Sequence, residues 1–290
     1  MAAIARTLVL LLVSAMMSAN AWDLTWSDEF DGTALNASNW NIRTNESHCC
    51  QFGKQELQLY VRDEVSVADG LLHIRTRRRT AVGPAAQGPP RDITYRYTSA
   101  WVETRGHFSQ RHGRWAANCS LPSSRARGIW PAFWLMPEAA PCWPTGGEID
   151  VMEFNGDPLQ DQVFGSYHWA PPGPQNCGKD RAPIPGRAWR PSGIKPHSDW
   201  QTKWHTYAIE WDRLGIKFFV DDQHYFTRNA SQVDLPAGSM FIILNQAIDP
   251  VLYPPTKSHP GEGYDNGVEM RCAWVRVWSG NTTQAAHAAR

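Results

Sequence analysis

The chain has 290 residues, and its 28 Lys and Arg residues balance its 28 Asp and Glu residues, so the formal net charge is zero. A neutral total argues against nucleic acid or an anionic membrane as the partner, because such binders carry a basic excess. The length suits one large hydrophobic core, since a single all-β domain commonly has about 200–250 residues.

The N-terminus has the pattern of a secretory signal peptide. Arg6 supplies the positive charge, residues 8–13 form a short apolar run, and residues 19–21 form an A-x-A cleavage site. The apolar run is too short to cross a bilayer, which needs about 20 residues, and an uncleaved anchor is the less favoured alternative. We therefore expect a secreted, monomeric protein with a signal peptide at 1–21 and one domain at 22–290.

An even number of cysteines in a secreted chain predicts disulfides, although the sequence does not choose the pairing. The cysteines are Cys49, Cys50, Cys119, Cys142, Cys177 and Cys272. A zinc site is disfavoured because no C-x-x-C or H-E-x-x-H spacing occurs. N-glycosylation sequons, which are relevant in a secreted protein, begin at Asn36, Asn45, Asn118, Asn229 and Asn281.

Short strands with period-two alternation follow one another along the chain. They are predicted at 71–77, 205–211, 216–220, 241–244 and 273–278. Asp221 and Asp222 predict a hairpin turn between two of the strands. Stretches rich in Pro or Gly are expected to be long loops, and they cover 80–92, 170–199 and 249–266. Many short strands without a long helical stripe predict an all-β sandwich or barrel.

Residues 145–154 (T-G-G-E-I-D-V-M-E-F) form a further predicted strand that carries three acids. Glu148 and Asp150 point to one face, because side chains alternate along a strand. Glu153 joins that face only if a β-bulge at 151–152 inserts one extra residue. Neighbouring carboxylates raise the pKa of at least one member, which provides the acid and the carboxylate that glycoside hydrolysis requires. The alternative is a solvated acidic strand face.

An aromatic run precedes the acids at 128–137 (G-I-W-P-A-F-W-L-M-P). Trp130, Ala132 and Trp134 share one face at period two. If that face also carries the acids, the indoles provide a platform for sugar rings. The alternative is that both tryptophans fill a hydrophobic core.

These motifs resemble glycoside hydrolase family 16. The segment E-I-D-V-M-E at 148–153 resembles the bulged E-I-D-x-x-E signature of its laminarinase-like members. Further similar stretches begin with Q-E-L-Q-L-Y at 55–60 and continue with Y-T-S at 97–99, T-R-G-H-F-S at 104–109, G-I-W-P-A-F-W at 128–134 and W-H-T-Y-A-I-E-W at 204–211. The resemblance implies an all-β jelly-roll sandwich of two antiparallel sheets with a concave substrate cleft, and a retaining mechanism.

By this resemblance, Glu148 is the expected nucleophile, Glu153 the acid/base, and Asp150 the acid between them. Trp130 and Trp134 resemble cleft tryptophans, and His168 resembles a histidine that contacts the substrate or the acid/base; a purely structural histidine is the alternative. Many relatives bind a structural calcium through an aspartate in the last strand. Ala273 stands at that position here, so neither a metal nor another cofactor is expected.

The expected function is endo-cleavage of a polysaccharide, most simply β-1,3-glucan. Two alternatives remain on the same fold: a non-catalytic β-glucan recognition protein and a transglycosylase. The glutamates favour an enzyme, because relatives that only bind glucan lack them. The sequence does not identify the polysaccharide among laminarin, mixed-linkage glucan, agar, carrageenan and galactan.

Overall fold

The computed structural model describes residues 22–46, 49–51, 54–123, 126–140, 142–154, 162–181, 187–189, 203–251 and 264–280, and at 49–51, 54 and 187–189 it describes the backbone alone. The predicted signal peptide at 1–21, the sequon at Asn281 and the side chains of Cys49 and Cys50 therefore lie outside the described part. In the described residues, no helix has the length and apolar character needed to cross a bilayer.

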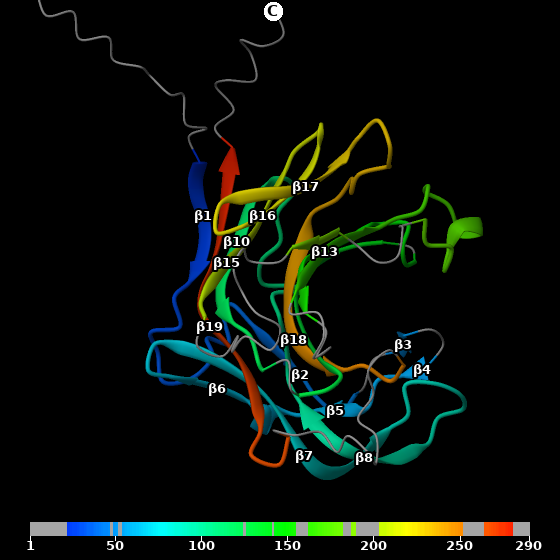
Figure 1. Cartoon of the computed structure of the whole chain (residues 1–290). Helices are drawn as coiled ribbons and strands as arrows, with labels where there is room; N and C mark the ends of the chain where they lie inside the picture. Colours follow the sequence, from blue (N-terminus) through cyan, green and yellow to red (C-terminus); the bar gives the residue numbers. More distant parts are fainter. Residues whose placement is uncertain are drawn as a thin grey trace, which may run out of the picture.

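Two sheets face each other as layers (Figure 1). One has the order β17 (Gln223–Asn229), β16 (Gly215–Val220), β15 (His205–Trp211), β10 (Gly113–Ser120), β19 (Val268–Gly280), β7 (Leu71–Pro84), β8 (Asp92–Ser99) and β5 (Gln58–Tyr60), with β1 (Trp22–Asp28) on β19 and β6 (Val65–Ala68) on β7. The other has the order β14 (Arg187–Trp189), β13 (Val163–His168), β12 (Glu148–Phe154), β11 (Ile129–Pro137), β18 (Met240–Ile248), β9 (Trp101–Glu103) and β2 (Asn41–Arg43). The predicted all-β sandwich is confirmed.

The remaining elements are short. β3 (Cys49–Gln51) pairs with β4 (Lys54–Gln55), and the 3-10 helices are η1 (Arg62–Glu64) and η2 (Pro174–Asn176). The strands in both sheets pair antiparallel, except that β5 runs parallel to β8. That single parallel pair is the exception to the predicted antiparallel sheets.

Both faces of the seven-stranded sheet carry clusters of apolar side chains. Phe133 and Leu135 of β11 point into the core between the sheets. Ala132 and Trp134, which alternate with them, belong to a second apolar cluster on the opposite face. We call this opposite face of the seven-stranded sheet the site face, because the acids of β12 lie on it.

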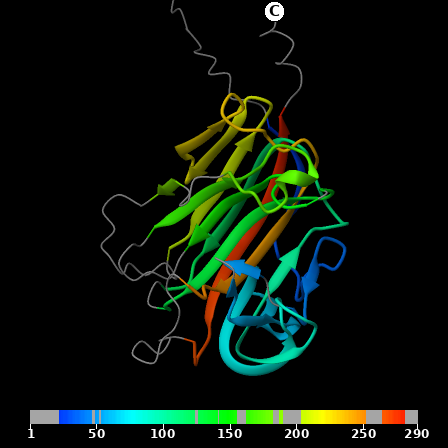
Figure 2. The ribbon, with the colours of Figure 1, turned by 90° about the vertical axis from the view of Figure 1, so that its right-hand side faces the viewer.

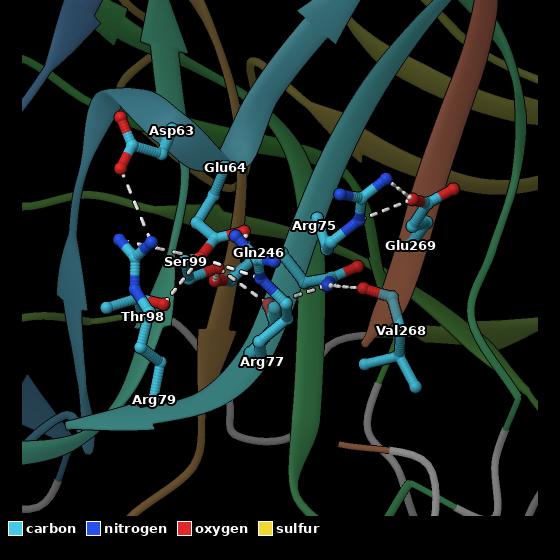
Figure 3. A network of polar contacts seen from close by, with 11 residues as sticks. Asp63, Glu64, Arg75, Arg77, Arg79, Thr98, Ser99, Gln246, Val268 and Glu269 are labelled. Atoms are coloured by element: carbon cyan, nitrogen blue, oxygen red, sulfur yellow. Dashed lines mark hydrogen bonds and ion pairs between the residues drawn. The ribbon is translucent and has the colours of Figure 1, made fainter. Parts of the chain in front are cut away.

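A polar network fastens the two sheets together (Figure 3). The Gln246 amide on β18 donates to Thr76 Oγ1 on β7 at 2.6 Å and to the Val268 carbonyl oxygen on β19 at 3.0 Å. The Ser99 hydroxyl on β8 donates to the Gln246 carbonyl oxygen. All four of these residues are buried. The network therefore supplies partners for polar groups that burial would otherwise leave unsatisfied.

The loop expected at 80–92 is mostly strand. β7 continues to Pro84 and pairs with β8, so the connection shrinks to residues 85–91 at the tip of a long hairpin, coloured cyan at the foot of the sandwich (Figure 2). Gly83 is there for close packing, since a Cβ at this position would lie 2.7 Å from Leu59 Cδ1. Glycine in this stretch thus marks a close approach within a strand, where the sequence suggested a loop.

The other two expected loops are described in part. Residues 170–181 contain η2, and Arg187–Trp189 form edge strand β14 on β13, so the described part of the interval 170–199 includes a strand that was not predicted. Of the interval 249–266, the structure describes 249–251 and 264–266, which form bends and turns.

Two disulfides resolve part of the pairing. Cys119–Cys272 joins neighbouring strands β10 and β19. Cys142–Cys177 joins the connection before β12 to the connection after β13. The predicted disulfide framework is confirmed for these four cysteines.

Candidate active site

The site begins with the predicted bulge in β12. Asp150 pairs with Ser166 on β13 and Glu153 pairs with Phe164, so three steps on β12 match two on β13. On β11, Asp150 lies opposite Trp134 and Glu153 opposite Ala132, again with one extra residue on β12. Residues directly opposite each other in a sheet share a face. The bulge therefore brings Asp150 and Glu153 to the same face.

The other β12 side chains anchor the strand. Ile149, Val151, Met152 and Phe154 are all buried in the core between the sheets. A charged side chain pointing the same way would be buried without compensation. The alternation of Glu148 with these residues, together with the bulge, therefore puts the acids on the site face.

Gly147 directly precedes β12. Its φ is +82°, and a Cβ there would lie 3.0 Å from both Pro236 Cγ and the Tyr167 hydroxyl. Only glycine accepts this combination without strain. The second glycine of the pair that precedes the acids thus takes a backbone conformation that other residues rarely adopt, directly before β12.

Glu153 receives two hydrogen bonds on the site face. The Trp130 indole N–H donates to Glu153 Oε1 at 2.9 Å, and the Ser166 hydroxyl donates to Glu153 Oε2 at 3.4 Å. Both donors come from the neighbouring strands β11 and β13. Trp130, which the sequence predicted as part of a sugar platform, therefore contacts one of the predicted acids directly.

Glu148 receives an indole N–H that sequence reasoning missed. The Trp143 N–H donates to Glu148 Oε2 at 2.9 Å, from the connection between β11 and β12. The Trp143 ring is 42% exposed and its centroid lies 5.9 Å from that of His168. A single tryptophan in a Pro-rich connection shows no periodic pattern. The one available signal is the adjacent Cys142, whose predicted disulfide indicates a cross-linked connection.

His168 lies opposite Glu148 at the end of β13. Its Nε2 is 3.2 Å from Asp150 Oδ2, and its Nδ1 is 2.6 Å from Asp180 Oδ2. Asp180 comes from the loop after β13, and the sequence gave no indication of its role. Burial lowers the pKa of His168, but the bonds to Asp150 and Asp180 outweigh burial and raise it to about 12.

The two glutamates hold protons unusually well. Burial is the largest cause that raises the pKa of both Glu148 and Glu153, and the Asp150 carboxylate raises both further. The positive charge of His168 acts in the opposite direction on both groups. Such opposed influences on paired acids are characteristic of sites that transfer protons.

Trp134 is less open than a sugar platform requires. Its side chain is 9% exposed, and its indole N–H donates to Asn245 Oδ1 at 2.8 Å. The Asn245 amide donates to the Tyr60 hydroxyl at 3.0 Å, which donates to Glu56 Oε2 at 2.9 Å. This series of hydrogen bonds fixes the Trp134 ring. Most of the ring is therefore packed against the protein, as the alternative of a core tryptophan predicted.

Three side chains of the site lie as close together as metal ligands do. Donor atoms of Glu148, Asp150 and His168 lie within 4.8 Å of one another. However, His168 Nδ1 donates to Asp180 Oδ2, and Nε2 lies 3.2 Å from Asp150 Oδ2, so two carboxylates favour the doubly protonated ring. A histidine with both nitrogens protonated has no lone pair for a metal.

Known proteins resemble this chain in sequence and in structure. The β-glucanase of Rhodothermus marinus is 34% identical over 216 residues, which are 71% of this chain and 65% of that protein. The glucan endo-1,3-beta-glucosidase of Cryptopygus antarcticus is 29% identical over 96% of this chain and 99% of that protein. The laminarinase catalytic domain of Thermotoga maritima superposes with a TM-score of 0.70 at 26% identity, over 90% of this chain and 99% of that chain.

The family profile of glycosyl hydrolases family 16 matches residues 36–247, which include the whole of β12. The similarities confirm the predicted jelly-roll fold and the predicted enzyme class, a glycosidase of the endo-β-glucanase type. The chain belongs to glycosyl hydrolases family 16.

Proposed function

We propose that this chain hydrolyses internal β-1,3 linkages of a glucan with retention of anomeric configuration. Glu148 is the nucleophile, Glu153 the acid/base, and Asp150 the charged group between them. The observation that carries the proposal is the bulged strand, which gathers the three acids on one face with the core residues on the other.

In the first step, the Glu148 carboxylate attacks the anomeric carbon while Glu153 gives its proton to the departing glycosidic oxygen. The glycosyl unit is then held on Glu148. In the second step, Glu153 removes a proton from water, whose oxygen attacks the same carbon and releases Glu148. The acid must still be protonated when the substrate binds, and burial and Asp150 raise the pKa of Glu153 to about 7. The same causes raise the pKa of Glu148 to about 8, so the division of roles between the two glutamates is proposed from the resemblance of the motif.

Substrate contacts are assigned to Trp130, Trp134 and His168. Trp130 is partly exposed beside Glu153, which suits contact with a sugar ring. Trp134 is 9% exposed and held by Asn245, and His168 adds a positive charge next to Asp150. The donors and rings on this face support a polysaccharide chain lying across the seven-stranded sheet.

We also propose secretion as a glycosylated monomer, with a signal peptide at 1–21 and a single catalytic domain at 22–290. Two disulfides support an oxidising compartment. The sequons at Asn36, Asn45 and Asn229 lie on exposed residues. Asn118 lies within β10 and donates to Thr206 Oγ1, so its sequon is less suited to carry a glycan than those three.

The test is the release of reducing ends from laminarin, mixed-linkage glucan, agar, carrageenan and galactan, with Glu148→Gln as the control. The proposal expects activity on laminarin that the control lacks. Binding without release in both proteins would favour the recognition protein, and products longer than the substrate would favour the transglycosylase. Release from another polymer alone would overturn the β-1,3-glucan assignment.

A further inference from the structure

The loop after β13 contributes Asp180, whose carboxylate contacts His168 at the site. Asp180 Oδ1 accepts a hydrogen bond from the Trp169 backbone N–H at 3.2 Å, and Asp180 Oδ2 lies 2.6 Å from His168 Nδ1. The Arg181 N–H donates to the Trp169 carbonyl oxygen at 2.9 Å and closes the turn. Both oxygens of the Asp180 carboxylate are therefore engaged with the end of β13.

The same loop is tied to the segment that carries Trp143. The Cys142–Cys177 disulfide joins the two connections, and the Gly178 N–H donates to the Trp143 carbonyl oxygen at 2.8 Å. Trp143 contacts Glu148, while Asp180 contacts His168. One cross-linked unit thus supports two neighbouring groups of the site.

The protonation of His168 follows from its neighbours. A neutral imidazole has one N–H and one lone pair, whereas a carboxylate can only accept. Asp150 and Asp180 face opposite ring nitrogens at 3.2 Å and 2.6 Å. The Nδ1–H donates to Asp180, and the Asp150 carboxylate beside Nε2 attracts a positive ring, so the pair of carboxylates favours the charged form.

We propose that Asp180 is a positioning residue that holds His168 as a permanent cation against Asp150, and so keeps a positive charge beside the predicted nucleophile. In the described part of the chain, the titratable groups that face His168 are Glu148, Asp150 and Glu153 from β12 and Asp180 from the loop. The His168 charge favours the ionised form of the Glu148 carboxylate. The proposal rests on the proposed function for its catalytic consequence, but not for the charge itself.

The chain supplies a matched control away from the site face. His205 Nδ1 lies 2.6 Å from Asp221 Oδ2, and the Thr206 N–H donates to Asp221 Oδ1 at 2.9 Å. This pair repeats the geometry of His168 and Asp180 on the ten-stranded sheet. Asp221 has a φ of 49° in a turn, which asparagine also accepts.

The experiment follows the His168 ring by NMR between about pH 5 and 9, where a free histidine titrates. We expect no titration in the wild type, a titrating His168 in Asp180→Asn, and no titration of His168 in Asp221→Asn. Asp180→Glu keeps the carboxylate and should retain the charged ring. A His168 that titrates in the wild type, or that stays charged in Asp180→Asn, would overturn the proposal.

Kinetics on the active polymer give the second readout. Asp180→Asn should lower kcat by about tenfold or more, which corresponds to the loss of one charge-assisted hydrogen bond, and leave KM within about twofold. Its alkaline limb should move to higher pH, because the neutral His168 ring no longer lowers the pKa of Glu153. A variant that only melts earlier, with its pH profile unchanged, would show a structural role alone. An inactive wild type would refute the proposed function, while the NMR result would still decide the charge of His168.

Discussion

At the scale of single residues, two indole N–H groups control the paired acids. Trp143 donates to Glu148 and Trp130 donates to Glu153, each at 2.9 Å. These bonds lower the pKa of their acceptors, whereas burial and Asp150 raise it. In each glutamate, burial raises the pKa and the indole hydrogen bond lowers it. Removal of one indole N–H should therefore change the pKa of one glutamate and not of the other.

Trp143→Phe removes the N–H and keeps an aromatic ring. We expect kcat to fall by about tenfold to a hundredfold, because a hydrogen bond to a charged group contributes about 1.5–3 kcal/mol. The matched control is Trp204→Phe, since Trp204 is 38% exposed and stacks on Arg271 outside the site. Equal losses in both variants, measured as kcat on laminarin, would count against the Glu148 contact.

Glu153→Gln should stabilise the protein at alkaline pH. The pKa of Glu153 is raised in the folded chain, so its stabilising contribution is complete below the ordinary value near 4.5 and is lost as pH rises through the folded value. Glutamine carries no charge to bury. Calorimetry should therefore give a higher Tm for the variant than for the wild type at about pH 8, and a smaller difference at about pH 4.

Glu29→Gln is the opposite-sign control for that experiment. Its hydrogen bond to Arg276 is the main cause that lowers the pKa of Glu29. The stability from this pair is present above the ordinary value and is lost as pH falls through the folded value. Glu29→Gln should therefore not raise Tm at alkaline pH. A rise in Tm there for this variant, or none for Glu153→Gln, would contradict the sign of the assigned shifts.

The sequence predicted the acids but not their supports. Glu148, Asp150 and Glu153 lie in one short motif, where alternation and one bulge suffice to orient them. Trp143 and Asp180 reach the same place from irregular connections, where periodicity carries no information. Such residues become apparent only when the fold brings separate loops together.

At the scale of elements, two disulfides have different tasks. Cys119–Cys272 is buried and joins β10 to β19 across a sequence separation of 153 residues. Cys142–Cys177 joins two loops beside the site across a separation of 35 residues. The first fastens the sandwich, and the second fastens the supports of Glu148 and His168. Removal of the first disulfide should therefore lower stability alone, whereas removal of the second should lower both stability and activity.

The paired variants are Cys119→Ala with Cys272→Ala, and Cys142→Ala with Cys177→Ala. Each loss should cost about 2–5 kcal/mol of unfolding free energy, because the unfolded chain regains entropy. The second pair should also lower kcat at a temperature where the protein is fully folded, whereas the first pair should not. Denaturant unfolding and kinetics under those conditions would measure both, and equal kcat in the two variants would refute the division.

Strands were predictable where alternation was strong. The interval 205–211 was predicted with the bounds that β15 has, and the turn at Asp221 and Asp222 separates β16 from β17. The interval 80–92 failed, because Gly83 and Pro84 indicate a loop locally while pairing with β8 extends the strand. Tertiary pairing overrides local composition in that hairpin.

At the scale of the whole molecule, the two sheets are joined by apolar packing and by the network around Gln246. Gln246 on β18 bridges to Thr76 and Val268 in the opposite sheet. Its chain neighbour Asn245 faces the other way and holds Trp134 on the site face. β18 therefore contributes both to the packing between the two sheets and to the position of Trp134 at the site.

Gln246→Leu should weaken this junction. The substitution removes the amide donor from the Val268 carbonyl oxygen and from Thr76 Oγ1, which keeps its bond to the Ser99 hydroxyl. A buried group left unsatisfied costs about 1–3 kcal/mol. We expect a lower unfolding free energy in urea with kcat nearly unchanged. An unchanged unfolding free energy would show that the network contributes no net stability.

The most direct measurement of the central claim is the anomeric configuration of the reducing ends that first appear from laminarin, followed by proton NMR before mutarotation. A retaining reaction through Glu148 predicts that the β-anomer appears first, and that Glu148→Gln releases neither anomer. The α-anomer appearing first, or release that persists in Glu148→Gln, would contradict a glycosyl intermediate on this residue.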